Sequence, residues 1–304
     1  MKIRLSVVGL FALLLAVVAI ASVRPSSVDA QENQAPTVVS VVTSNTSNGT
    51  TDNFPGGSIT PIAGGTKTIY VNGLVEDLDG QNTITNVRGV FHRSGATSGG
   101  SCTNSGNDCY VKATCDVVND GNQNRKVYSC RADLQYYSDS TDASGRYPSE
   151  NWIARVEVTD GIATGTNNAL TKEMNSVLSL NYGGPISFGN HNMGDVTTSG
   201  NNVEYTFAQS GNVNADVEVS MAGGMTCVSG SIAPGAFKWA LTDVGFTSGS
   251  STTMTGSAVD TNLDVGYGTD GSPSPSKFLY FNMSVPYSIG GICNGITTLS
   301  AISH

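Results

Sequence analysis

A short acidic segment holds the side chains best suited to bind a cation. Glu76, Asp77 and Asp79 bring carboxylates together within a few residues, and Asn82 adds an amide oxygen. Calcium prefers several oxygen ligands on flexible loops, so this segment predicts a calcium site that Asp160 could join from elsewhere in the fold. The alternative is an Asp-Gly turn between strands, in which Asp accepts hydrogen bonds from nearby backbone and Gly supplies a positive φ.

Six cysteines form the second group of reactive side chains. An even number of cysteines is typical of a disulfide framework when a chain leaves the cytoplasm. Zinc binding would require closely spaced Cys-x-x-Cys or Cys/His pairs, which the sequence does not contain. Four cysteines lie in the first half and two in the second: Cys102, Cys109, Cys115, Cys130, Cys227 and Cys293.

The register of one predicted hairpin selects among the possible disulfides. If residues 110–118 pair antiparallel with residues 126–136 so that opposed numbers sum to 245, Cys115 faces Cys130. The same register places apolar pairs on that face of the hairpin, because side chains alternate along strands: Val111 with Leu134, Ala113 with Ala132 and Val117 with Tyr128. We therefore predict three disulfides: Cys115–Cys130, Cys102–Cys109 and Cys227–Cys293.

No pattern typical of an enzyme is present. His92, His191 and His304 are widely spaced, and the sequence has no Gly-x-Ser-x-Gly elbow, His-Glu-x-x-His pair or phosphate-binding loop. We therefore predict no catalytic residue, no cofactor-binding residue and no cofactor other than a possible calcium ion. A carboxylate pair for glycoside hydrolysis stays open, since its two members can come from distant strands.

Four aromatic side chains allow two interpretations. Tyr136, Tyr137, Trp152 and Trp239 could form a platform on which sugar rings stack, or they could fill a hydrophobic core. Two of the four fall on inward faces of predicted strands, which favours packing in the core.

The N-terminus predicts export. Lys2 and Arg4 precede an apolar run over residues 5–23, and small residues before Gln31 match a signal-peptidase site after Ala30. The run is also long enough to span a bilayer as a helix, so an uncleaved N-terminal anchor is the alternative. The predicted location is secreted or at the extracellular cell surface, with membrane attachment only through this segment.

The charge of the chain excludes one class of partner. The net charge is −9, and removal of residues 1–30 would bring it to −11. A nucleic-acid-binding protein needs a basic face to displace phosphate counterions, so we predict no nucleic-acid partner.

The elements that must position these residues are strands. Alternating apolar patterns recur after the leader, among them residues 37–43, 66–76, 83–91, 151–159, 203–208, 215–221 and 277–285. Gly-rich turns separate them, and helical periodicity is almost absent. The sequence predicts an all-β protein with two antiparallel β-sandwich domains, residues 31–170 with two disulfides and residues 175–304 with one, separated by a polar linker at about residues 165–175.

Three short motifs carry a family resemblance. The segments 33–36 (NQAP), 75–80 (VEDLDG) and 152–161 (WIARVEVTDG) together resemble immunoglobulin-like or cadherin-like β-sandwich modules of prokaryotic cell-surface proteins. The resemblance covers roughly residues 33–164. It implies a cell-surface location, and it implies that Asp77 and Asp79 are the positions that bind calcium.

These observations together predict an exported, non-enzymatic structural or adhesive protein of the cell surface, such as a filament or surface-layer subunit. Residues 37–43 could assemble copies by completing a neighbour's sheet, and other surface proteins or glycans are alternative partners. A secreted glycan-binding or calcium-dependent binding module is the second hypothesis. A secreted hydrolase with a site built from distant loops is the third.

Overall fold

Strands and turns make up the part of the chain that the computed structural model describes, which is residues 32–54, 57–96 and 101–304. Residues 34–304 form one compact unit. The predicted all-β class is confirmed, because helical structure in the described residues is limited to short 3₁₀ turns such as Pro234–Ala236. No helix in those residues is long and apolar enough to cross a membrane. The predicted leader, its cleavage point and the alternative anchor helix lie outside the described residues.

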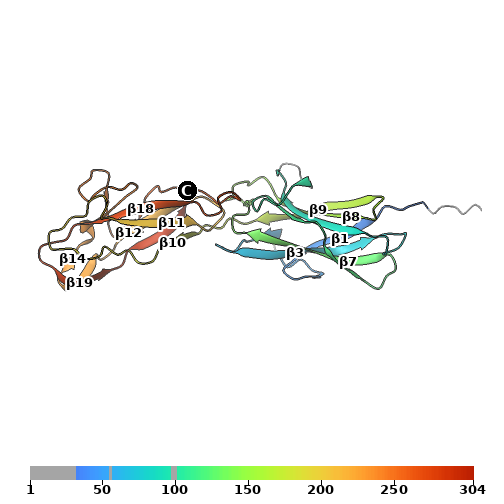
Figure 1. Cartoon of the computed structure of the whole chain (residues 1–304), viewed down its shortest axis with the longest axis horizontal. Helices are drawn as coiled ribbons and strands as arrows, with labels where there is room; N and C mark the ends of the chain where they lie inside the picture. The colour runs from blue at the N-terminus through green and yellow to red at the C-terminus, as the bar shows by residue number, and fades with distance from the viewer. Residues whose placement is uncertain (1–31, 55–56, 97–100) are drawn as a thin grey trace, which may run out of the picture. The chain divides into compact units, whose positions relative to one another are not determined.

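Two sheets form a sandwich from the first half of the chain (Figure 1). The first sheet has the order β1–β3–β7–β6, built from β1 (Thr37–Ser44), β3 (Thr66–Glu76), β7 (Arg125–Gln135) and β6 (Asp116–Asn119). The second has the order β2–β9–β8–β4–β5, built from β2 (Ser58–Ile59), β9 (Thr164–Met174), β8 (Trp152–Thr159), β4 (Asn86–Arg93) and β5 (Cys109–Lys112). All neighbours are antiparallel except β2 and β9.

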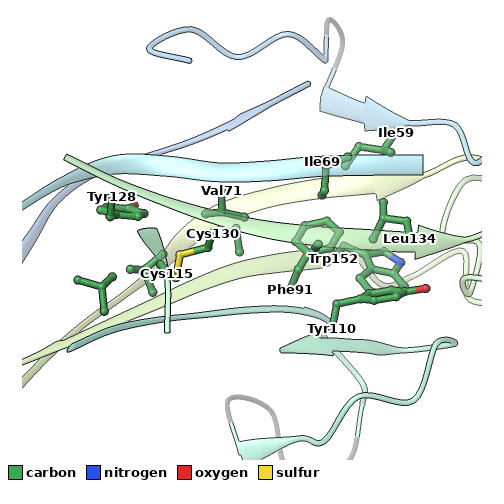
Figure 2. Close-up of a cluster of buried hydrophobic side chains, with 14 of the residues drawn as sticks. Ile59, Ile69, Val71, Phe91, Tyr110, Cys115, Tyr128, Cys130, Leu134 and Trp152 are labelled. Carbon is green, nitrogen blue, oxygen red and sulfur yellow. A yellow bond between two sulfur atoms is a disulfide. The ribbon is translucent and has the colours of Figure 1, made fainter. Parts of the chain in front are cut away.

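The core of this sandwich follows from the alternation in its strands. Every second residue of β8, beginning with Trp152, is fully buried, while the residues between them stay partly exposed. The Trp152 ring stacks on Phe91 of β4 with centroids 5.1 Å apart, and Tyr110 of β5 packs on the same indole (Figure 2). Ile69 and Leu134 supply the facing layer from β3 and β7.

Residues 37–43, predicted to complete a neighbour's sheet, lie in β1 of the chain's own sheet. β1 pairs with β3 from Thr37 to Ser44, with a register shift between Val38 and Ser40. The Tyr128 hydroxyl donates to the carbonyl of Ser40 at 2.8 Å, and the Ser40 hydroxyl accepts from the backbone of Leu74. These bonds tie β1 to its neighbour β3 and to the next strand, β7, so its removal would open this sandwich.

The predicted pairing of residues 110–118 with residues 126–136 is correct between Cys115 and the turn, and it is wrong for the residues that precede Cys115. β6 pairs with β7 in the expected register, with Val117 opposite Tyr128. Residues before Cys115 leave that sheet: β5 joins the other sheet, where Val111 pairs with Val90 of β4 rather than with Leu134. One continuous strand was expected because both pieces alternate, but the chain changes sheets between them.

The crossing point is fixed by a disulfide that lies between the two sheets (Figure 2). Cys115 and Cys130 are bonded, and their Cα atoms are 4.6 Å apart. The backbone N–H of Cys115 donates to the carbonyl of Val87 in β4 at 2.8 Å. A Cβ atom on Gly89 of β4 would lie 2.6 Å from the Cβ atom of Cys130, so glycine is needed beneath the disulfide.

Gly89→Ala should therefore destabilise the protein. The added methyl must displace a disulfide that is held from both sides, and overpacking of this kind costs about 1–3 kcal/mol of unfolding free energy. The melting temperature should fall by a few degrees for each kcal/mol lost. Gly249→Ala is the matched control, because no heavy atom lies within 4 Å of its added Cβ and its φ is not positive. Equal melting temperatures of the two variants would show that the contact imposes no packing constraint.

The second half of the chain builds a further sandwich. Its larger sheet has the order β10–β11–β18–β15–β16, built from β10 (Leu180–Tyr182), β11 (Val203–Gln209), β18 (Ser276–Met283), β15 (Phe237–Ala240) and β16 (Thr252–Thr253). The facing sheet has the order β17–β12–β20, built from β17 (Val259–Asp260), β12 (Ala215–Ser220) and β20 (Thr298–Ser303). A third sheet has the order β14–β13–β19, built from β14 (Ser231–Ile232), β13 (Met225–Ser229) and β19 (Gly290–Gly295).

The two halves have separate hydrophobic clusters. One cluster draws its buried residues from positions 54–174 and the other from positions 205–289. The second contains Val217 and Val219 of β12, which face Phe207 and Phe281 of the larger sheet. The clusters agree with two sandwiches, while their independence as folding domains stays a prediction.

The polar linker predicted at residues 165–175 is strand β9. Its Thr and Asn residues mostly lie on the exposed side, and only Lys172 and Met174 are buried. A strand with one solvent-exposed face and few apolar residues has the composition of a linker, so the sequence pattern did not predict a strand here.

Candidate functional site

The predicted calcium residues form a tight turn after β3. Asp77 is buried, and its two carboxylate oxygens accept hydrogen bonds from the backbone N–H of Asp79 at 3.0 Å and the hydroxyl of Thr83 at 2.7 Å. The backbone N–H of Gly80, where φ is +119°, donates to the carbonyl of Asp77. Asp79 accepts from the backbone N–H of Gln34 at 2.6 Å. Both carboxylates thus hold the backbone in place, as in the Asp-Gly turn alternative.

Two of the other predicted oxygen ligands, Asp160 and Glu76, also have protein partners. Asp160 accepts from the backbone N–H groups of Ile162 and Ala163, both at 2.7 Å, and Glu76 accepts from Arg125 at 2.8 Å. Among the residues that the structure describes, no group of three or more His, Cys, Asp or Glu side chains is arranged to hold a metal ion. Calcium at Asp77 and Asp79 stays a prediction, and it would have to replace hydrogen bonds that now stabilise the turn.

Asp77→Ala separates these two roles. If the carboxylate serves the turn, the variant should lower the melting temperature by the same amount in calcium and in a calcium chelator, because two hydrogen bonds to an ionised group are lost in both buffers. Differential scanning calorimetry of the wild type and the variant in the two buffers measures this. A wild-type stabilisation by calcium that disappears in Asp77→Ala, with Asp120→Ala as the control turn residue, would assign the ion to this turn instead.

A buried charge cluster lies at the other end of β8, around Arg93. The Arg93 guanidinium donates to Asp139 at 2.9 Å and to Glu150 at 2.5 Å, and it lies over the Tyr147 ring at 3.6 Å from the centroid. The indole N–H of Trp152 donates to the carbonyl of Asp139 at 2.9 Å. These contacts fasten the segment between β7 and β8 onto the core.

The protonation of this cluster suits a structural role. Burial lowers the pKa of Arg93, but the hydrogen bond to Glu150 and the negative charges of Asp139 and Glu150 outweigh it, so the pKa of Arg93 is raised above its ordinary value. Burial raises the pKa of Asp139, and the positive charges of Arg93 and Arg146 oppose that shift. The side chains of Arg93 and Asp139 are only 9% and 5% exposed, which leaves no room for a substrate between them. Removing one partner of such a buried pair leaves an uncompensated charge, so the cluster is expected to matter for stability.

The four aromatic residues considered as a sugar platform do not form one. Trp152 is fully buried in the first core and Trp239 is 7% exposed in the second. Tyr136 and Tyr137 contact each other edge to face with centroids 5.1 Å apart. Burial raises the pKa of Tyr137, and this ring forms one wall of a polar groove.

That groove has a volume of about 550 Å³ and lies beside the first sandwich. It lies next to the outer edge of β5, where the carboxamide of Asn104 accepts from the backbone N–H of Val111 at 2.5 Å and donates to its carbonyl at 3.5 Å. Charged and hydrogen-bonding side chains of both polarities suit an uncharged, hydroxyl-rich ligand. The lining includes Asn104, Lys112, Arg131, Asp133, Gln135 and Tyr137.

The three histidines stay apart, each with its own local partner. The His92 ring contacts the carbonyl of Arg93 at 3.0 Å, and His191 contacts the carbonyl of Phe188 at 2.9 Å. His304 pairs with Asp216 of β12 at 2.8 Å. No two of the three histidines share a partner in the described part of the chain.

The His304–Asp216 pair predicts a pH dependence of stability. The hydrogen bond to Asp216, with the further negative charges of Asp264 and Asp260, raises the pKa of His304 above 6.5. The stabilisation is therefore fully present below pH 6.5 and is lost as the pH rises through the folded-state pKa. The urea midpoint of the wild type should exceed that of His304→Gln at about pH 5.5 and approach it at about pH 9. A difference that does not change with pH would mean that the pair carries no net charge interaction.

The six cysteines are bonded as Cys102–Cys109, Cys115–Cys130 and Cys227–Cys293. Cys227 and Cys293 are directly opposite each other on β13 and β19. Both pack against the second core, so the residues beside them on the same strands point away from it.

An exposed apolar patch on β13 and β19 escaped the sequence analysis. Val228 is 82% exposed and Ile292 is 76% exposed, each next to one of the paired cysteines. Because Cys227 lies opposite Cys293 on antiparallel strands, Val228 and Ile292 are neighbours across the two strands. A Cβ atom on Gly291 would lie 2.6 Å from the Val228 side chain. Tyr287 and Ile296, at 83% and 80% exposure, flank β19. The apolar residues of this Gly-rich segment are isolated from one another in the sequence, so the sequence pattern did not predict the patch.

Comparisons with known proteins assign no family. No family model matches the chain, and no curated protein matches it. Among solved structures, the C-terminal domain of the AgI/II polypeptide BspA of Streptococcus agalactiae is 9% identical, with 86% of this chain and 98% of that chain covered and a TM-score of 0.20. A TM-score this low supports no argument on fold or function.

Proposed function

We propose that this chain is an exported, non-enzymatic structural or adhesive protein of the cell surface. The apolar patch of Val228 and Ile292 carries the proposal, because large exposed apolar side chains gathered in one place are typical of contact sites. The Cys227–Cys293 bond joins the two strands behind this patch and holds them together.

Two further observations support the proposal. Three disulfides within an all-β chain suit an oxidising location outside the cytoplasm. The net charge of −9, spread over a chain in which only 13% of residues are charged, favours contacts through uncharged surfaces over electrostatic capture of an acidic partner.

Negative-stain electron microscopy of the exported protein, with and without calcium, tests the assembly part of this proposal. Regular filaments or sheets are expected for the wild type. The double substitution Val228→Ser/Ile292→Ser should strongly reduce the number of filaments or sheets, because it removes two exposed apolar side chains and leaves the core unchanged. Val117→Ser/Val118→Ser removes the same kind of side chain from the exposed strand β6 and should leave assemblies intact. Isolated particles of the wild type in every buffer would contradict a self-assembling subunit.

A glycan-binding module is the second candidate, and the polar groove beside β5 favours it. Lys112 and Arg131 would donate to hydroxyl oxygens and Asp133 would accept from them, while Tyr137 offers a ring wall. Arg131→Ala, an exposed position, should weaken binding on a glycan array without lowering the melting temperature. The absence of any saturable glycan signal for the wild type would remove this candidate.

A further inference from the structure

The second sandwich has one strand edge that is left unprotected. Natural sheets usually blunt their edges with short strands, charges, proline, bulges or a covering segment. Here β14, β16 and β17 are two residues long, β10 is three residues long, and the pairing of β13 with β19 contains a register shift. β20 (Thr298–Ser303) has none of these features: it pairs with β12 over its whole length without a shift, and its sequence TLSAIS carries no charge, proline or glycine.

No strand in the described residues pairs with the outer edge of β20. Ala301 lies opposite Val217, so it faces the same side of the sheet as that buried valine. Ala301 is nevertheless exposed, whereas Val217 is 1% exposed. The larger sheet therefore does not cover β20 at Ala301, although Leu299 of the same strand packs against the second core.

An apolar pocket of about 410 Å³ lies next to this edge. It contains no charged side chain, and Leu299 of β20 and Tyr182 of β10 both belong to its wall. Tyr182 is 64% exposed although β10 belongs to the larger sheet. The pocket is thus lined by the facing edge strands of the two layers and extends to Tyr205 and Phe281 of the core. A further strand beside β20 would cover it.

We propose that the outer edge of β20 pairs with the same edge of a second copy of this chain, antiparallel, so that one sheet runs through both copies. Such pairing is isologous, since each copy offers and receives the same strand. It deepens the proposed function, on which it rests, by naming a second copy as the partner and the β20 edge as a second contact surface beside the patch of Val228 and Ile292.

The lack of charge on β20 makes this edge the place where two copies of the chain can meet. Two copies with a net charge of −9 repel each other over most of their surface. The six residues of β20 bring no charge to the contact, and the nearest strand with acidic residues, Asp216 and Glu218 of β12, lies one strand further away. Antiparallel pairing of this strand with itself, centred on Ser300, places Leu299 against Ala301 and Thr298 against Ile302, and it puts no like charges opposite each other.

Ala301→Lys tests the edge. An inward-pointing charge on an edge strand prevents strand addition, while the long side chain can reach water from this open position. Sedimentation velocity of the wild type from about 1 to about 200 µM should show concentration-dependent dimers or larger species, because a contact of this size is expected to be weak. Ala301→Lys should stay monomeric over the same range with an unchanged melting temperature. Thr253→Lys, on the short exposed edge β16, is the matched control and should associate like the wild type.

Hydrogen exchange gives a second readout that does not depend on a variant. The outward-facing amides within residues 298–303 should exchange several-fold more slowly at high protein concentration than at low concentration, while the amides of β16 should not change. A wild type that stays monomeric, or association that persists in Ala301→Lys without protection of these amides, would overturn the proposal. If ordered assemblies form in Ala301→Lys as in the wild type, the edge is wrong while the surface function stands. If β20 dimers form but no assemblies are seen, the edge holds and the filament function fails.

Discussion

The Cys115–Cys130 disulfide is the constraint on which the first sandwich depends. Cys115 is joined to one sheet by its sulfur, through Cys130 of β7, and to the other by its backbone, through the carbonyl of Val87 in β4. Gly89 leaves the space in which the two sulfurs fit. The chain changes sheets immediately before this residue, so one covalent bond fixes both the spacing of the layers and the path between β5 and β6.

The Arg93 cluster performs the complementary task in the segment between β7 and β8. That segment contains little regular structure, and it contributes Asp139, Tyr147 and Glu150 to a single guanidinium. Burial of these charges is costly, and the cost is offset because each one is paired and the indole of Trp152 binds the backbone at the same place. The disulfide and the ion cluster thus secure the irregular connections that the alternating strands cannot secure by themselves.

The sequence was informative where one face of a strand is apolar. The alternation of β8 and β12, the register of β6 with β7 and the all-β class could all be predicted from it. It was uninformative where the strand signal is weak: β9 is polar on its wet side, and β13 and β19 are short and rich in Gly, Ser and Thr. The Arg93 cluster could not be found either, since positions 93, 139 and 150 are brought together only by the fold and no short motif contains them.

Whether the outer edge strand of a sheet is open or already covered determines how this chain can associate without unfolding. β1 is an edge strand as well, but donating it to a neighbour would break its ladder with β3 and expose Thr43 and Ser44, which are fully buried. The edge of β5 is already occupied, because the Asn104 carboxamide bonds both backbone groups of Val111. At β20 the outer edge pairs with no strand in the described residues and an apolar pocket lies beside it, so association there would break no strand pairing. Assembly through an open edge is therefore cheaper than strand exchange, since the exchange must first open a folded sandwich whereas the edge adds bonds to an intact one.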